Sequence, residues 1–103
     1  MILLIGEFLG TLLVTYVVFA TQSAVAVGIA LTISILLIGK TTAASVPPGA
    51  NFNPAIMMAA VAAGKVPAST LIPSIVAQIA GALVGLEFYK HLGVAHQSTI
   101  PGA

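Results

Sequence analysis

The sequence lacks four residue types and nearly all charge. Cysteine, tryptophan, arginine and aspartate are absent, and only 5% of the 103 residues are charged, against about 25% in a typical soluble domain. Without cysteine the chain forms no disulfide and no thiolate metal site. A net charge of +1 without arginine excludes the basic surface that nucleic-acid binding requires. We therefore expect no nucleic-acid partner, no metal and no cofactor.

Apolar residues make up most of the chain. They account for 59% of it, and the mean hydropathy is +1.18. A chain with so few charges cannot cover its surface in water, which predicts an integral, multi-pass membrane protein surrounded by a lipid bilayer. The N-terminal apolar run lacks a basic n-region and is longer than the apolar core of a signal peptide. We interpret it as a retained transmembrane helix.

Polar and helix-breaking residues divide the chain into segments. A bilayer-crossing helix needs roughly 20 residues, so the uncharged stretch 8–39 is too long for one span, and the triplet Thr21-Gln22-Ser23 divides it. Further on, Pro47, Pro48 and Gly49 force turns in an uncharged loop, which fits burial within protein at membrane depth. These signals predict a single domain over 1–91 and a polar tail over 92–103. The domain begins with two long helices, over 2–21 and 24–40. A loop over 41–53, a short helix over 54–64 and a third long helix over 67–90 follow.

The short helix over 54–64 is about 16 Å long, roughly half of the hydrocarbon core. The predicted fold class is therefore an all-α membrane protein with three transmembrane helices plus a re-entrant half-helix. Asn53 is a good N-cap and Pro54 suits the first helical position, so capping alone explains the Asn-Pro sequence. A half-bilayer helix, however, brings the positive end of its dipole to the membrane centre. There a capping Asn53 keeps a free NH₂ donor for the oxygen of water or an alcohol.

Several stretches resemble the aquaporin, or major intrinsic protein, family. The sequence around Asn53-Pro54-Ala55 resembles the family signature, and other stretches resemble motifs of its first and third helices. The matching stretches are GANFNPA (49–55), GEFLGT (6–11), VPA (66–68) and IVAQIAG (75–81). The resemblance implies one aquaporin-like repeat, and a passive transmembrane channel for water or small uncharged solutes such as glycerol rather than an enzyme.

The family normally joins two such repeats, inverted in the membrane, whereas this sequence contains one. The resemblance therefore implies that the pore forms in an inverted homodimer, whose second Asn53 comes from a partner copy. The family's usual assembly of four pores would then contain eight chains. Lys40 and Lys65 are expected on one side of the membrane and Lys90 on the other. A difference of two lysines against one is too weak to fix a single orientation, so copies could insert in both orientations, which is called dual topology.

The resemblance also implies roles for particular residues. Glu7 and Gln78 would hold the re-entrant loop, although Glu7 could instead reach the membrane surface. Ile56 stands where a second repeat carries arginine, so Lys40 could supply positive charge at the pore mouth, or could be a solvated lysine at a helix end. The predicted pore or substrate-binding residues are Asn53, Pro54, Ala55, Ile56, Ala50, Ile29, Ile33 and Lys40. Structural support is predicted for Glu7, Gln78, Gly49, Gly6, Gly10, Gly81 and Gly85.

The last four of these glycines form two pairs spaced by four residues. Such spacing lets membrane helices approach closely, although small residues are also simply common in membrane helices. Two other functions stay open. One is a dual-topology, proton-coupled small-molecule exporter that uses Glu7, which the 6% aromatic content disfavours because such sites are rich in aromatic residues. The other is a non-transporting membrane assembly protein.

Overall fold

A computed structural model of the chain describes residues 2–42 and 52–92, and within these ranges every regular element is a helix. The elements are α1 (Ile2–Thr21), α2 (Ala24–Thr42), α3 (Pro54–Ala62), the 3₁₀ turn η1 (Ala68–Thr70) and α4 (Leu71–Leu92). α1 has the predicted bounds, α2 is two residues longer than predicted, and α3 ends two residues earlier. The third long segment differs most, because a separate 3₁₀ turn precedes α4.

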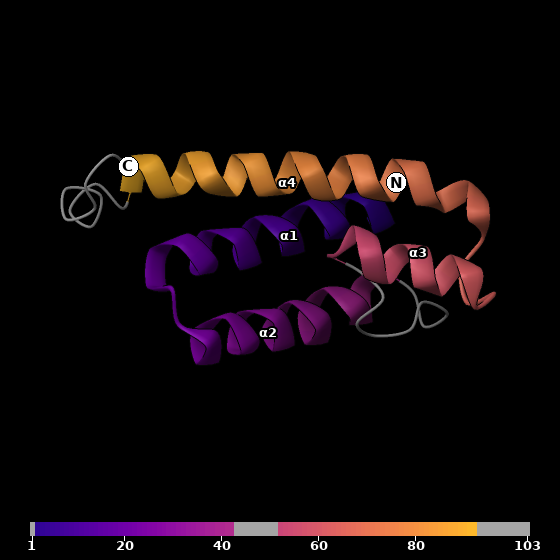
Figure 1. The fold of residues 1–103 in the computed structure, drawn as a ribbon, viewed down its shortest axis with the longest axis horizontal. Coiled ribbons are helices and arrows are strands. Elements are labelled where there is room, and N and C mark those ends of the chain that lie inside the picture. The colour runs from indigo at the N-terminus through magenta and orange to yellow at the C-terminus, as the bar shows by residue number, and fades with distance from the viewer. Residues whose placement is uncertain (1, 43–51, 93–103) are drawn as a thin grey trace.

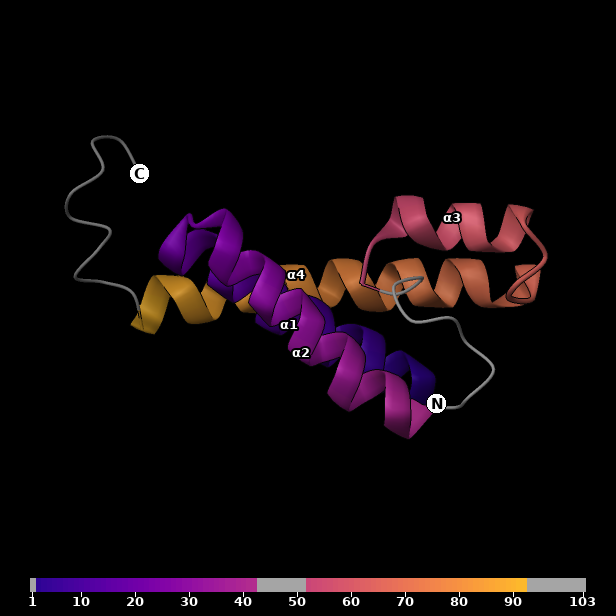
Figure 2. The ribbon, with the colours of Figure 1, turned by 90° about the horizontal axis from the view of Figure 1, so that it is seen from below.

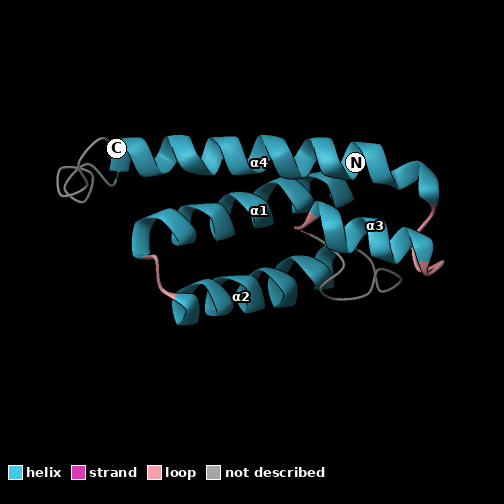
Figure 3. Ribbon diagram, viewed as in Figure 1, coloured by secondary structure: helices cyan, strands magenta, loops and turns pink. Residues whose placement is uncertain are grey.

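The helices are arranged in layers, with α1 between α2 and α4 (Figure 1). α1 and α2 form an antiparallel hairpin, and α4 packs along the other side of α1. The short helix α3 lies beside the first part of α4, as the view turned by 90° also shows (Figure 2). Figure 3 shows that loops occupy little of the described chain besides the turns at the helix ends. The start of α3 therefore lies near the middle of α4.

The polar triplet divides α1 from α2, as predicted. Gln22 adopts a positive φ of 51°, a conformation uncommon for residues other than glycine. The hydroxyl of Thr21 accepts a hydrogen bond from the N–H of Ser23 at 3.2 Å. The hydroxyl of Ser23 in turn accepts from the N–H of Ala26 at 3.2 Å, which caps the first turn of α2.

A glycine ends α3 at about half the length of a membrane span. Gly64 has φ +73°, and its N–H donates to Val61 O at 3.0 Å while the next N–H, of Lys65, donates to Ala60 O at 2.9 Å. This pair of bonds is the Schellman motif, which satisfies the last carbonyls of a helix. Val66 then packs against Met57 and Ala60. Local sequence therefore sets the length of α3, at about 13 Å for nine residues.

The contact between α1 and α4 depends on the glycine pair of α4. Gly81 faces the backbone oxygen of Phe8, and a Cβ atom there would overlap it. A Cβ atom at Gly85 would lie 2.6 Å from the backbone oxygen of Leu12. This pair therefore allows the close approach that its spacing predicts. Gly10 differs, because a Cβ atom there would meet the ring of Phe52, so this glycine receives a side chain from the loop.

Several polar side chains are buried in the described fold, and many large apolar side chains are exposed, while Met57, Val66 and Tyr89 are buried. The buried polar residues are Glu7, Thr11, Ser34, Ser74 and Gln78. On the opposite face of α4, Ile72, Val76, Ile79 and Leu83 are each at least half exposed. Two segments, Leu4–Thr21 and Ala68–Leu92, are long and apolar enough to cross a membrane. The apolar stretch of α2, Ala24–Leu37, is shorter, so the part of the second predicted span, 24–40, whose side chains the structure describes does not by itself meet the same test.

Adding one methyl group at Gly81 should separate α1 from α4. We expect Gly81→Ala to lower the free energy of unfolding by about 1–3 kcal/mol, because the backbone of Phe8 must move. Gly28→Ala is the matched control, since a Cβ atom there meets nothing within 4 Å, and it should stabilise α2 by about 0.5–1 kcal/mol. Thermal unfolding in detergent, followed by circular dichroism, measures both. Equal melting temperatures for the two variants would contradict the close contact.

Candidate functional site

Glu7 connects three separate parts of the described structure. It lies in the second turn of α1 and is 1% exposed. Its Oε1 accepts a hydrogen bond from the backbone N–H of Phe52 at 2.8 Å, and its Oε2 accepts from Nε2 of Gln78 on α4 at 3.2 Å. The loop contact is the one that the resemblance implied for Glu7. Both carboxylate oxygens are therefore used within the protein, and the side chain is buried rather than exposed.

Phe52 is the loop residue that Glu7 holds. It is 8% exposed and has φ +72°, a conformation rare for a bulky residue. Its N–H points to the Glu7 carboxylate, and its ring fills the space left by the missing side chain of Gly10. Phe52 was not predictable as a site residue, because nothing in its residue type indicates a left-handed backbone.

Asn53 begins α3 with its amide group divided between two roles. Its Oδ1 accepts a hydrogen bond from the N–H of Ala55 at 2.8 Å, which caps the helix, and Pro54 occupies the first helical position. No residue in the described ranges accepts a hydrogen bond from its NH₂ group. Because the side chain is exposed, this donor is available at the positive end of the α3 dipole.

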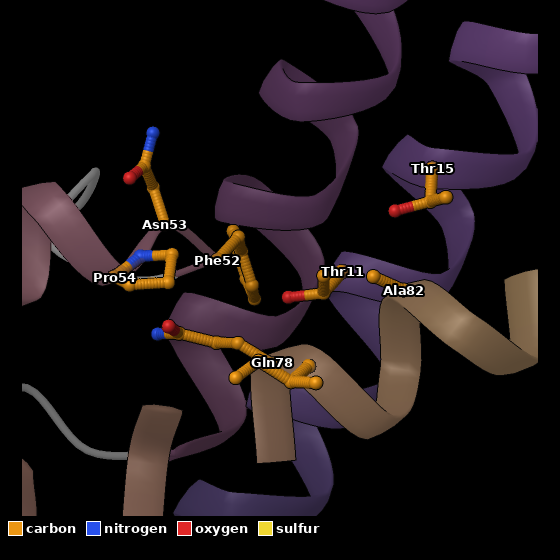
Figure 4. A pocket seen from close by; sticks show the side chains of 8 residues that line it. Thr11, Thr15, Phe52, Asn53, Pro54, Gln78 and Ala82 are labelled. Atoms are coloured by element: carbon orange, nitrogen blue, oxygen red, sulfur yellow. The ribbon is translucent and has the colours of Figure 1, made fainter. Parts of the chain in front are cut away.

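A hollow of about 290 Å³ opens beside this turn. Its lining residues come from α1, α4 and the start of α3: Thr11, Thr15, Phe52, Asn53, Pro54, Gln78, Ile79 and Ala82 (Figure 4). Thr11 Oγ1 and Gln78 Oε1 are buried and have no hydrogen-bond partner among the described residues. Both residues line the hollow, as does Asn53, whose side chain is exposed. Buried polar atoms of this kind commonly bind a small polar molecule or water.

The predicted pore residues are not all brought together in one chain. Asn53, Pro54 and Gln78 line this hollow, while Ala55 and Ile56 are exposed on α3. Ile29 and Ile33 instead line a separate apolar hollow of about 330 Å³ between α1 and α2, with residues Leu13, Val17, Thr21, Ala26 and Ala30. Gly49, Ala50 and the side chain of Lys40 fall outside the described part of the chain. Ile29 and Ile33 are predicted to line the mouth of a pore that two copies would form, and this stays a prediction, since a single chain shows them only in the hollow beside α1.

Thr11 and Thr15 were missed from sequence, although a signal was present. They follow Glu7 at intervals of four residues, which places all three side chains on one face of α1. On α4 the buried residues Ser74, Gln78, Gly81 and Gly85 have similar spacing. Ile79 and Ala82 carry no comparable signal, because apolar residues are found all around this helix.

Comparison with known proteins provides no assignment. No protein-family model matches the chain, and no solved structure matches it significantly.

Removing the Glu7 carboxylate should release the loop. Glu7→Leu leaves the Phe52 N–H and the Gln78 NH₂ without their acceptor, at a cost of about 1–3 kcal/mol for each buried group. We expect a lower melting temperature and much faster hydrogen exchange at the Phe52 amide. Glu87→Gln is the control, since Glu87 is exposed, pairs with Lys90 and lies 3.7 Å from Nε2 of His91, and its replacement should change stability little. Unchanged exchange at Phe52 in Glu7→Leu would show that Glu7 does not hold the loop.

Proposed function

We propose that this chain is one aquaporin-like repeat that spans a membrane and forms a passive channel for water or small uncharged solutes, with the pore completed by a second, inverted copy. The observation that carries the proposal is that the oxygen and the NH₂ group of the Asn53 side-chain amide have different roles. Its oxygen caps α3, and its NH₂ group remains a donor beside a hollow that Thr11 and Gln78 also line.

The distribution of side chains supports a membrane location. In water, large apolar side chains are buried and polar ones are exposed, whereas here Glu7 and Gln78 are buried and the apolar stripe of α4 is exposed. The two long apolar segments are only 22% buried, unlike the core helix of a soluble protein. The second of them, Ala68–Leu92, lies far from the N-terminus and so does not resemble a signal sequence.

The chemistry at the start of α3 suits an uncharged permeant. The Asn53 NH₂ group can donate to the oxygen of water or of an alcohol. The positive end of the α3 dipole lies at the same place as the Asn53 side chain, and a positive potential there disfavours cations and protons. A neutral molecule that accepts a hydrogen bond from the exposed Asn53 NH₂ group would regain there one of the bonds that it makes in bulk water.

A second copy is needed because α3 is short. α3 covers about 13 Å, whereas α4, with 22 residues, is about 33 Å long and comparable to a bilayer core of about 30 Å. Beyond the start of α3, the rest of α4 has no short helix beside it in the described ranges (Figure 2). A second, inverted copy would supply the other half-helix, in the manner of inverted repeats that place their site near the midplane.

The contacts of Glu7 favour the channel over the proton-coupled exporter. A proton carrier must exchange protons with solvent, but Glu7 is 1% exposed and both its oxygens accept hydrogen bonds. It is also absent from the lining of the hollow. These contacts suit a fixed support for the loop.

Asn53→Ser keeps the cap and withdraws the donor. Serine caps a helix about as well as asparagine, so the fold should be retained, but its single O–H donor lies closer to the backbone than the two N–H donors of the amide. In proteoliposomes under osmotic shock we expect water flux per protein to fall about tenfold, the upper range for one lost hydrogen bond. Thr32→Ala is the control, because Thr32 is exposed and bonds only its own helix at Gly28 O. Equal shrinkage of vesicles with and without the unmodified protein would refute a water channel.

The absence of cysteine allows a direct test of inverted insertion. Ala63 is exposed at the outer end of α3, so Ala63→Cys introduces a single thiol there. In intact cells a membrane-impermeant maleimide should label about half of the chains, because dual topology places equal numbers in each orientation. Permeabilised cells provide the value for full labelling. Labelling of nearly all or of no chains would rule out the inverted pair.

A further inference from the structure

Phe52 is held at its backbone and at its ring, and neither contact involves α3. Its N–H donates to Glu7 Oε1 at 2.8 Å. Its ring occupies the space beside Gly10, where a Cβ atom would overlap ring carbons and reach Cζ at 2.7 Å. The residue keeps φ +72°, which is rare for a bulky side chain and is maintained only where surrounding contacts require it. Phe52 therefore has a position that α1 determines.

The position of Asn53 follows from that of Phe52, because the two residues share a peptide bond. Asn53 has φ −148° and ψ 120°, and its Oδ1 is bound to the N–H of Ala55. With the backbone and the oxygen both fixed, the direction of the NH₂ group is fixed as well. A shift of the Phe52 ring would turn the shared peptide and move this donor relative to Thr11 and Gln78 across the hollow.

We propose that Phe52, seated against Gly10, is a positioning residue that sets where the Asn53 donor lies and how wide the hollow is beside it. The inference rests on the proposed function for its consequence in solute selection, but the positioning itself is a property of the fold. Phe52 is also one wall of the hollow. The combined size of the side chains at positions 10 and 52 therefore determines which neutral solutes fit next to the Asn53 amide.

Three variants change this contact in a controlled way. Gly10→Ala adds a methyl group where the ring lies, Phe52→Leu removes ring atoms, and the double variant combines a larger residue with a smaller one. The matched control is Gly28→Ala, which adds the same methyl group in open space. Asn51 and Asn53 are the only asparagines, so ¹⁵N-asparagine labelling yields two side-chain NH₂ groups, and Asn53→Ser identifies which signals belong to Asn53.

The first readout is the NMR position of the Asn53 NH₂ signals, which a purely global loss of stability would not move selectively. We expect them to shift in Gly10→Ala, to return toward their original positions in the double variant, and to stay unchanged in Gly28→Ala. The second readout is the ratio of glycerol to water permeability in proteoliposomes. This ratio should change about threefold in Gly10→Ala and recover in the double variant, as expected for two residues in direct contact.

The two readouts separate failure of this inference from failure of the proposed function. Unmoved Asn53 signals in Gly10→Ala, or no recovery in the double variant, would overturn the inference whether or not the protein conducts. If the unmodified protein conducts neither water nor glycerol, the channel proposal fails, and the NMR signals still decide the positioning role. If Gly10→Ala does not fold, Phe52→Leu provides the test, since it removes atoms, and unmoved Asn53 signals there would overturn the inference.

Discussion

The buried carboxylate of Glu7 is the interaction on which the rest of the described structure depends. It lies on α1 and accepts hydrogen bonds from the Phe52 backbone and from Gln78 on α4. An ionisable group inside an apolar bundle is costly unless its hydrogen bonds are satisfied. Here that requirement forces the loop, α1 and α4 into one arrangement. The loop then leads directly into Asn53 and α3, so the placement of the candidate site follows from this contact.

Close helix packing makes that arrangement possible. Gly81 and Gly85 remove side chains from the α1–α4 contact, where the backbone of Phe8 and Leu12 lies. Gly10 likewise lacks a side chain, and the Phe52 ring occupies the space that a side chain would fill. Side chains larger than glycine at these three positions would push α4 or the loop away from α1, and the Glu7 hydrogen bonds would lengthen. Small residues and one carboxylate thus act together, since neither alone would define the position of α3.

Much of the secondary structure could be predicted because its signals are local. The polar triplet at 21–23, the cap at Asn53 and the turn at Gly64 each act within a few residues, and the helix ends lie at or near the predicted positions. The loop contact of Glu7 was anticipated only through a family resemblance. The left-handed conformation of Phe52 and the separate hollow beside Ile29 and Ile33 were not predictable, because they depend on segments that meet only in the folded chain.

The sequence by itself determined an apolar, nearly uncharged chain of long helices with one short helix that Asn53 caps and a turn at Gly64 closes. These features depend on hydrogen bonds and side chains within one or two helical turns. Only the tertiary structure decided that Glu7, Phe52 and Gln78 meet, that Asn53 lines a hollow together with Thr11 and Gln78, and that Gly10 receives an aromatic ring. The physical reason is that these contacts join residues more than 40 positions apart, and no local pattern encodes which buried polar groups will satisfy one another.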